Sequence, residues 1–456
     1  MGLETLLNPQ LQRPDVIVLK NLIRDANAPA VTKTNGTSNG NGHAAKPVNG
    51  KANGAANYTT NTTPGKSTTS GPGFEAEDEE TIKVLTDINN PKLETFEPSI
   101  FSSFDVDLKS SNPLIRFLVK PYFNWARTVV RRETDVVFLT HILIYCFINA
   151  PSALWLFYSF SWPHAIAHGL FTAISAGPFT LMLHNHIHNN GVLKPAYGWF
   201  DQSFPYVLEP LMGHSWDSYY YHHVKHHHIE GNGPGDLSST VRYQRDNALH
   251  FLHYLFRFML LVWIELPIYF IKKGRYGMAA RVFVSESTTY TIYFLLAKWR
   301  FLPTLWVFLI PIFVMRTAMM VGNWGQHAFV DEVEPDSDFR SSITLIDVTS
   351  NRHCFNDGYH TSHHLNPLRH WRDHPVALIK AKKQYADGRA LTFADIDYFM
   401  ITLMLCTKNY GYLADHLVPM GEQIGMTREQ KMAMLKTKTK AFTEEELRRK
   451  FKGMSK

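Results

Sequence analysis

The chain has 456 residues, 45% of them hydrophobic and 13% aromatic, which is enough to build a large core. Its formal net charge of +6 is concentrated beside apolar segments and at the C-terminus, where it indicates membrane flanks and not a nucleic-acid surface. The three cysteines are far apart and lack a CxxC spacing, which argues against a disulfide framework and a zinc knuckle.

Residues 1 to about 80 are rich in Asn, Gly, Thr and Ser and contain few large apolar side chains. Such a segment buries too little surface to offset the entropy of ordering it, so we predict disorder, apart from a short helix near residues 16–24. The first 30 residues lack the pattern of a signal peptide, so membrane insertion is expected to depend on internal spans.

Two apolar stretches, 136–160 and 165–183, contain no Asp, Glu, Lys or Arg and are each long enough to cross a bilayer. Basic residues precede the first stretch and place its start in the cytosol. Two more spans are predicted, one around 289–297 with its flanks and one at 301–321. The stretch 251–271 is predicted to be an interfacial or re-entrant helix, because a fifth crossing would put the histidine clusters described below on opposite sides.

We therefore predict an all-α membrane protein with four transmembrane helices and a cytosolic helical cap that holds a histidine-rich site for two metals. Residues 110–380 would form the catalytic membrane domain, and residues 381–456 a cytosolic helical tail. Both termini are expected in the cytosol.

Nine histidines fall into four short clusters that carry this site. They are His184 and His188; His223, His226 and His227; His327; and His360, His363 and His364. Spacings of i, i+3 and i+4 bring side chains to one face of an α-helix. Imidazole nitrogen suits Fe, Zn, Cu and Ni, and nine ligands are too many for one tetrahedral zinc, so we expect two metals. No HExxH motif of a zincin protease and no Glu-x-x-His pairs of a soluble di-iron bundle are present.

Histidines that lie near these clusters without fitting the spacing are not assigned as ligands, because a lone histidine is more often a surface or hydrogen-bonded core residue. They are His186, His214, His222, His228, His353, His370 and His374.

The clusters resemble the three histidine boxes of the membrane fatty acid desaturase superfamily, read here as HxxxH, HxxHH and HxxHH. Asn323-Trp-Gly-Gln-His327 is similar to the Asn and the ninth histidine of acyl-CoA desaturases. The resemblance covers roughly residues 110–380. It implies that the nine histidines hold two iron ions (Fe2+/Fe3+), with Asn323 near one of them through a water. O2 would be the co-substrate, and no catalytic residue is expected beyond the ligands.

The implied activity is O2-dependent desaturation of a fatty acyl or related lipid chain. Lipid or specialised-metabolite hydroxylases and oxygenases share the boxes and form the alternative, and a non-catalytic metal-binding scaffold is a third possibility. The sequence has no His-Pro-Gly-Gly motif of a fused cytochrome b5, so a separate electron donor, such as cytochrome b5 with its reductase, is expected. The lipid bilayer, in the endoplasmic reticulum, and an acyl-lipid substrate are the other expected partners.

Carboxylates beside the boxes are expected to orient imidazoles by accepting their second N–H. Asp347 and Asp357 are predicted for this role, and Asp236 and Asp331 are further candidates. All four are equally compatible with helix caps or loop carboxylates.

Overall fold

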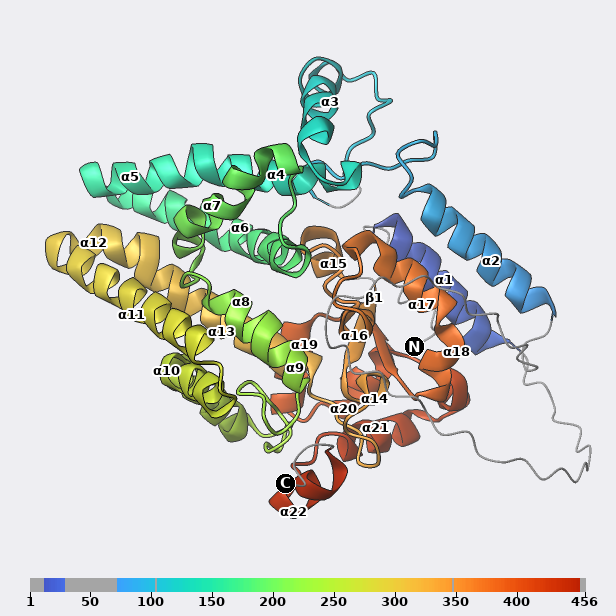
Figure 1. Cartoon of the computed structure of the whole chain (residues 1–456). Helices are drawn as coiled ribbons and strands as arrows, with labels where there is room; N and C mark the ends of the chain where they lie inside the picture. The colour runs from blue at the N-terminus through green and yellow to red at the C-terminus, as the bar shows by residue number, and fades with distance from the viewer. Residues whose placement is uncertain (1–11, 29–71, 103–104, 347, 452–456) are drawn as a thin grey trace, which may run out of the picture.

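The computed structural model describes residues 12–28, 72–102, 105–346 and 348–451. Long helices gather in one half of the molecule and short elements in the other (Figure 1). The long-helix half and the segments attached to it comprise α3 (Lys120–Val129), α4 (Val136–Ile144), α5 (Ala150–Tyr158), α6 (Trp162–Asn189), α7 (Gly198–Leu208), α8 (Ser218–His222), α9 (His228–Glu230), α10 (Ala248–Lys272), α11 (Tyr276–Trp299), α12 (Phe301–Thr304) and α13 (Ile310–Gln326).

The other half, here called the cap, is built from both ends of the chain (Figure 1). It comprises α1 (Arg13–Asn27), α2 (Pro72–Asp87), α14 (Asp338–Ser341), β1 (Ile343–Ile346), α15 (Thr349–His353), α16 (His360–Leu365), α17 (His374–Lys380), α18 (Lys382–Asp387), β2 (Leu391–Ala394), α19 (Tyr398–Cys406), α20 (Tyr410–His416), β3 (Leu417–Val418), α21 (Arg428–Thr437) and α22 (Glu444–Lys450). The prediction of an all-α membrane fold is confirmed, with three short strands among the described residues.

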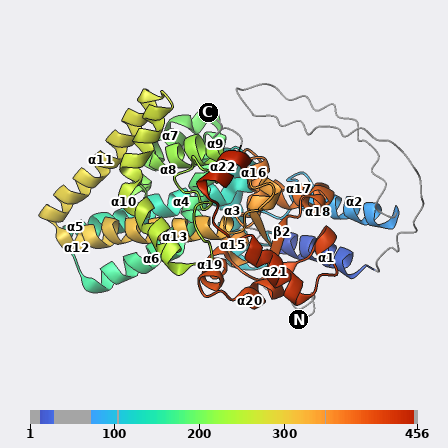
Figure 2. The same ribbon diagram turned by 90° about the horizontal axis from the view of Figure 1, so that it is seen from below.

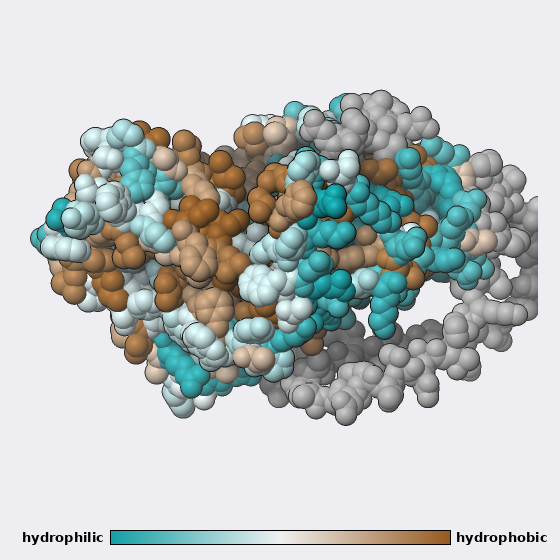
Figure 3. Space-filling model, turned by 90° about the horizontal axis from the view of Figure 1, so that it is seen from above, coloured by the Kyte–Doolittle hydropathy of each residue, from teal (hydrophilic) through white to brown (hydrophobic). Residues whose placement is uncertain are grey.

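Four helices are long and apolar enough to cross a membrane, so the chain is a multi-pass membrane protein. They are Glu133–Tyr158, Trp162–Asn189, Ala248–Lys272 and Phe301–Gln326. Large apolar side chains on this half point outward, and Phe147, Leu154 and Ile174 are each more than 70% exposed. Figure 3 shows apolar residues spread over this half and hydrophilic residues over the cap. Such a surface suits hydrocarbon and not water.

The choice of spans differs from the prediction at one point. The length and composition of α10 allow it to cross the membrane, although we expected an interfacial or re-entrant helix there. In contrast, α11 was expected to cross but is not among the four apolar helices. In α11 polar residues lower the hydropathy, and its Glu286 pairs with Arg316 of α13 at 2.9 Å. Figure 1 shows α11 beside α12 and α13, whereas α10 is seen nearly end-on and crosses them in Figure 2. The interfacial placement of α10 therefore stays a prediction.

The cap is organised around a three-stranded sheet with the order β1-β2-β3. β1 runs parallel to β2, with Ile343 opposite Leu391, and β2 runs antiparallel to β3, with Phe393 opposite Leu417. β2 and β3 lie beyond residue 380, so the predicted boundary between catalytic domain and tail passes through this sheet. α19 packs on α13, where Thr402 Oγ1 donates a hydrogen bond to the Val321 carbonyl at 3.0 Å.

Two stretches of the N-terminal segment, for which disorder is predicted apart from a short helix, are helical in the structure. Residues 13–27 and 72–80 are helical, and α1 contains the short helix expected at 16–24, while residues 1–11 and 29–71 lie outside the described chain. α1 buries Val18, Leu19 and Leu22 against the cap. Its buried Asp15 accepts hydrogen bonds from Tyr359 Oη at 2.6 Å and Asn351 Nδ2 at 3.1 Å. These contacts tie α1 to the start of α16.

Candidate metal centre

The end of α6 presents the first two predicted ligands. α6 is continuous for 28 residues and ends at Asn190, whose φ of 52° stops the helix. Because His184 and His188 are spaced i, i+4, their rings lie on one face, with centroids 4.7 Å apart.

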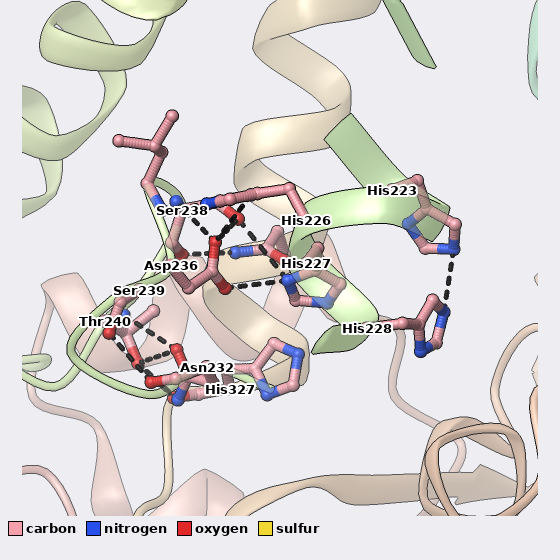
Figure 4. A network of polar contacts seen from close by, with 12 residues as sticks. His223, His226, His227, His228, Asn232, Asp236, Ser238, Ser239, Thr240 and His327 are labelled. Carbon is pink, nitrogen blue, oxygen red and sulfur yellow. Dashed lines mark hydrogen bonds and ion pairs between the residues drawn. The ribbon is translucent and has the colours of Figure 1, made fainter. Parts of the chain in front are cut away.

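The central histidine run forms a π-helical turn at His223–His227. The backbone N–H of His228 donates to the His223 carbonyl, and i→i+5 bonding of this kind widens the turn relative to an α-helix. His227 and His228 therefore return to the side of His223. Figure 4 shows His223 and His228 facing each other, while His226 lies beside the loop that carries Asp236 and Ser238.

The remaining ligand candidates come from the end of α13 and from α16. His327 directly follows α13, and His360, His363 and His364 lie on the single α-helical face that their spacing predicts. His360 Nε2 lies 3.1 Å from His327 Nε2.

Imidazole nitrogens from these elements form two adjoining groups. Within each group the nitrogens lie within 4.8 Å of one another, and the groups consist of His184, His188, His223 and His363, and of His227, His327 and His364. His360 contacts the second group. His228 Nε2 lies 3.1 Å from His223 Nε2 and 2.9 Å from His363 Nε2. Eight of the nine predicted histidines thus meet, and His226 does not join them.

The chemistry of this donor set fits two transition-metal ions. Burial lowers the pKa of these imidazoles well below the ordinary value, and neighbouring imidazoles lower it further, which keeps them in the neutral form that binds metal. This holds for His223, His228, His327, His360 and His363. The buried Nε2 atoms of His188 and His364 have no hydrogen-bond partner among the described residues. All-imidazole groups of this kind suit iron, zinc, copper or nickel.

Residues 160–394, more than half of the chain, match the fatty acid desaturase family. The chain belongs to the fatty acid desaturase family. No curated protein and no solved structure matches it. The matched region of this desaturase-family chain contains all the histidines of both groups, from the end of α6 to α16.

Hydrogen-bond acceptors and donors around the groups fix several imidazoles of the desaturase-family centre. His227 Nδ1 bonds Asp236 Oδ2 at 2.7 Å, and Asp236 Oδ1 accepts from both the N–H and the hydroxyl of Ser238. His184 Nδ1 lies 3.2 Å from Tyr219 Oη, and His327 Nδ1 lies 3.4 Å from the Ser341 carbonyl. A proton held on Nδ1 of His227 leaves Nε2 free for a metal.

The predicted carboxylates have different places in the structure. Asp347 lies outside the described residues. Asp357 is deeply buried beside the site, where burial raises the pKa of its carboxyl to about 7, and no imidazole bonds it in the described chain. Asp331 pairs with Lys438 and Arg340 and not with an imidazole in the described chain. Asp236, one of the further candidates, is the carboxylate that bonds an imidazole.

Asn323 lies at the edge of the centre, on α13. Its Nδ2 donates to the Ser238 carbonyl at 2.9 Å and to Tyr254 Oη at 2.6 Å. The side chain therefore links α13 to the loop of Asp236 and to α10, and it lines the cavity described next.

A cavity of about 460 Å³ leads from the histidines into the long-helix half. On α6 its lining recurs at i, i+3, i+4 and i+7, which marks one continuous helix face. The lining from α6 comprises Gly169, Thr172, Ala173, Ala176, Gly177, Thr180, Leu181 and His184. α13 supplies the opposite wall, and Trp306 lies at the far end beside Gly169. From His184 to Gly169 the helix rises roughly 22 Å at 1.5 Å per residue.

Four of the seven histidines that miss the spacing have hydrogen-bond partners outside the two histidine groups. His186 bonds the Asp201 carbonyl, His214 bonds Thr180, His370 bonds Asp135 and His374 bonds Ser362. His222 differs, because its buried Nε2 has no hydrogen-bond partner among the described residues and it lies in a third group with His226 and Asp236. His228 differs as well, and the π turn that moves it is not visible in residue spacing.

Proposed function

We propose that this chain catalyses O2-dependent desaturation of a fatty acyl or related lipid chain at a non-haem di-iron centre. The observation that carries the proposal is the long apolar cavity, which runs from the two histidine groups between α6 and α13. Its apolar side chains on α6 and α13 offer dispersion contacts along a hydrocarbon, while many of its polar side chains belong to the histidine groups and their neighbours. A methylene chain lying in it would pass beside the imidazoles.

Two irons held by the imidazoles would supply O2 activation and removal of hydrogen from an unactivated C–H bond. The protein's own residues hold the metal ligands in place, orient the imidazole rings and shield the reacting carbon from water. Asp236 and Tyr219 fix the rings of His227 and His184. The apolar wall of α6 and α13 would keep water from the reacting carbon and set which carbon lies nearest the centre.

Electrons would come from a separate donor such as cytochrome b5 with its reductase, since the sequence has no cytochrome b5 motif. The endoplasmic reticulum membrane, with both termini cytosolic, is the proposed location. This topology puts the histidine groups and the cap on the donor's side.

Lipid analysis of cells that express the chain tests the proposed reaction. We expect a product two hydrogens lighter than its precursor, formed only with O2 and absent from cells that express His363→Ala, which removes one ring of the first group. A product one oxygen atom heavier than its precursor would show that the chain catalyses hydroxylation and not desaturation. A product that persists in His363→Ala would contradict catalysis at this centre.

The end of the cavity at Gly169 and Trp306 predicts control of chain length. A Cβ at position 169 would lie 2.7 Å from Trp306 Cζ3, so Gly169→Ala must push the indole and shorten the cavity. We expect the ratio of turnover with long-chain substrates to turnover with short-chain substrates to fall at least about tenfold, because one methylene in an apolar pocket is worth roughly 1–3 kcal/mol. Trp306→Ala should shift the preference toward longer chains.

The matched control is Gly277→Ala on α11, where a Cβ meets nothing within 4 Å. It should leave the substrate profile unchanged. Equal profiles for Gly169→Ala and Gly277→Ala would contradict the assignment of the cavity as the acyl site.

A further inference from the structure

If the HxxHH spacing lay on an α-helix, it would put His226 on the same side of the central histidine turn as His223. In the structure, His228 and not His226 lies on that side. In an α-helix, residues i, i+3 and i+4 share a face, which would group His223 with His226 and His227. In the observed π turn the hydrogen bonds run from i to i+5, so positions i+4 and i+5 come back to the side of residue i. His223 is thereby grouped with His227 and His228.

His228 lies between the two imidazole groups. Its ring centroid is 4.8 Å from that of His188, 4.7 Å from that of His363 and 5.2 Å from that of His364. Its Nε2 points at the Nε2 atoms of His223 and His363, at 3.1 and 2.9 Å. Several neutral imidazole nitrogens converging at such distances, with no carboxylate among them, form the arrangement that a shared metal would stabilise.

His226 is directed away from both groups, toward the loop at 235–237. Its Nε2 accepts the backbone N–H of Leu237 at 3.3 Å and lies 3.3 Å from the Gly235 carbonyl. Its Nδ1 faces Asp236 Oδ1 at 3.7 Å, and its ring packs edge-on against Tyr269 with centroids 4.4 Å apart. A lone pair used for the Leu237 N–H is not available to a metal at the centre.

We propose that His228, and not His226, completes the metal centre, an inference that rests on the proposed function. The ligands are then His184, His188, His223, His227, His228, His327, His360, His363 and His364. His226 is a positioning residue, because it holds the 235–237 loop and so places Asp236 against His227 (Figure 4).

Iron content of the purified full-length chain tests this exchange, with His226→Ala and His228→Ala compared with the wild type. The wild type should contain two irons per chain. His228→Ala should lose at least half of them, and His226→Ala should keep both at saturating iron. Thermal unfolding of both variants serves as the folding control. In His228→Gly, free imidazole should restore iron, since it can occupy the space of the deleted ring, whereas in His226→Gly it should change nothing.

Two results would overturn the exchange while leaving the di-iron proposal in place: loss of iron in His226→Ala to the level of His228→Ala, or full iron in His228→Ala. If His228→Ala does not fold, the imidazole response of His228→Gly decides, and a folded His228→Gly that keeps both irons without imidazole excludes His228 as a ligand. A folded wild type that binds no iron at all would overturn both the proposed function and this inference.

Discussion

Replacing Arg245 with methionine is expected to unfold the chain at a temperature roughly 5–10 °C below that of the wild type. Arg245 is fully buried in the loop that follows the central histidines. Its guanidinium donates to the carbonyls of Ala328, Thr240, Val241, Tyr243, Lys438 and Lys440. Methionine fills a similar volume but donates nothing. The carbonyls of Thr240, Val241 and Lys438 would each keep a backbone N–H donor, whereas those of Ala328, Tyr243 and Lys440 would lose the guanidinium without replacement.

Each buried polar group left unsatisfied costs about 1–3 kcal/mol, so the total loss should exceed about 4 kcal/mol. Thermal unfolding of the detergent-solubilised protein measures it. The matched control is Arg242→Met, three positions earlier, where the guanidinium is partly exposed and pairs with Glu444. Surface pairs contribute about 0–1 kcal/mol, so that variant should unfold near the wild-type temperature. Equal losses in the two variants would show that the buried hydrogen bonds of Arg245 are not what stabilises the loop.

Asp236→Asn is expected to weaken iron binding and turnover by about 10–100-fold, the usual cost of removing a hydrogen-bond partner of a ligand histidine. Burial alone would raise the pKa of Asp236, but His227 and its hydrogen bond outweigh burial and hold that pKa well below its usual range. The residue is therefore a carboxylate that keeps the proton of His227 on Nδ1. An amide has only one acceptor oxygen and can present its NH2 group instead, which would disfavour this tautomer.

Iron titration and turnover of Asp236→Asn should fall together while the unfolding temperature changes little. Asp338→Asn is the control, because Asp338 is about half exposed and its carboxylate lies 3.6 Å from His364 Nδ1, beyond hydrogen-bond distance. That variant should bind iron nearly as the wild type does. A loss of iron in Asp338→Asn as large as in Asp236→Asn would contradict a special role for Asp236.

The fold class and most of the centre could be predicted because they depend on local periodicity. Uncharged apolar stretches indicated the long helices, and i, i+4 spacing placed His184 with His188. The structure places His226 differently from the prediction, which assumed an α-helix where the backbone forms a π turn, and backbone hydrogen bonding of that kind leaves no mark in residue spacing.

Contacts between segments that are distant in sequence account for the other differences between the predictions and the structure. The carboxylates were chosen by closeness in sequence, yet Asp236 reaches His227 only because the intervening loop folds back. The extent of α1 was underestimated because its four buried hydrophobic residues, Val18, Leu19, Leu22 and Ile23, gain their stability from packing against the cap, which the composition of the segment does not describe.

Both ends of the described chain close on the centre, and this sets an order of assembly. Asp15 bonds Tyr359, 344 positions away, and Arg245 bonds carbonyls 193 and 195 positions away. Contacts this far apart in sequence form late, since the loops that they close are long. The membrane helices leave the ribosome well before Lys438 does. The contacts that close the cap are therefore completed only in the finished chain, so any metal that the closed site holds would reach its final surroundings in a protein already embedded in its membrane.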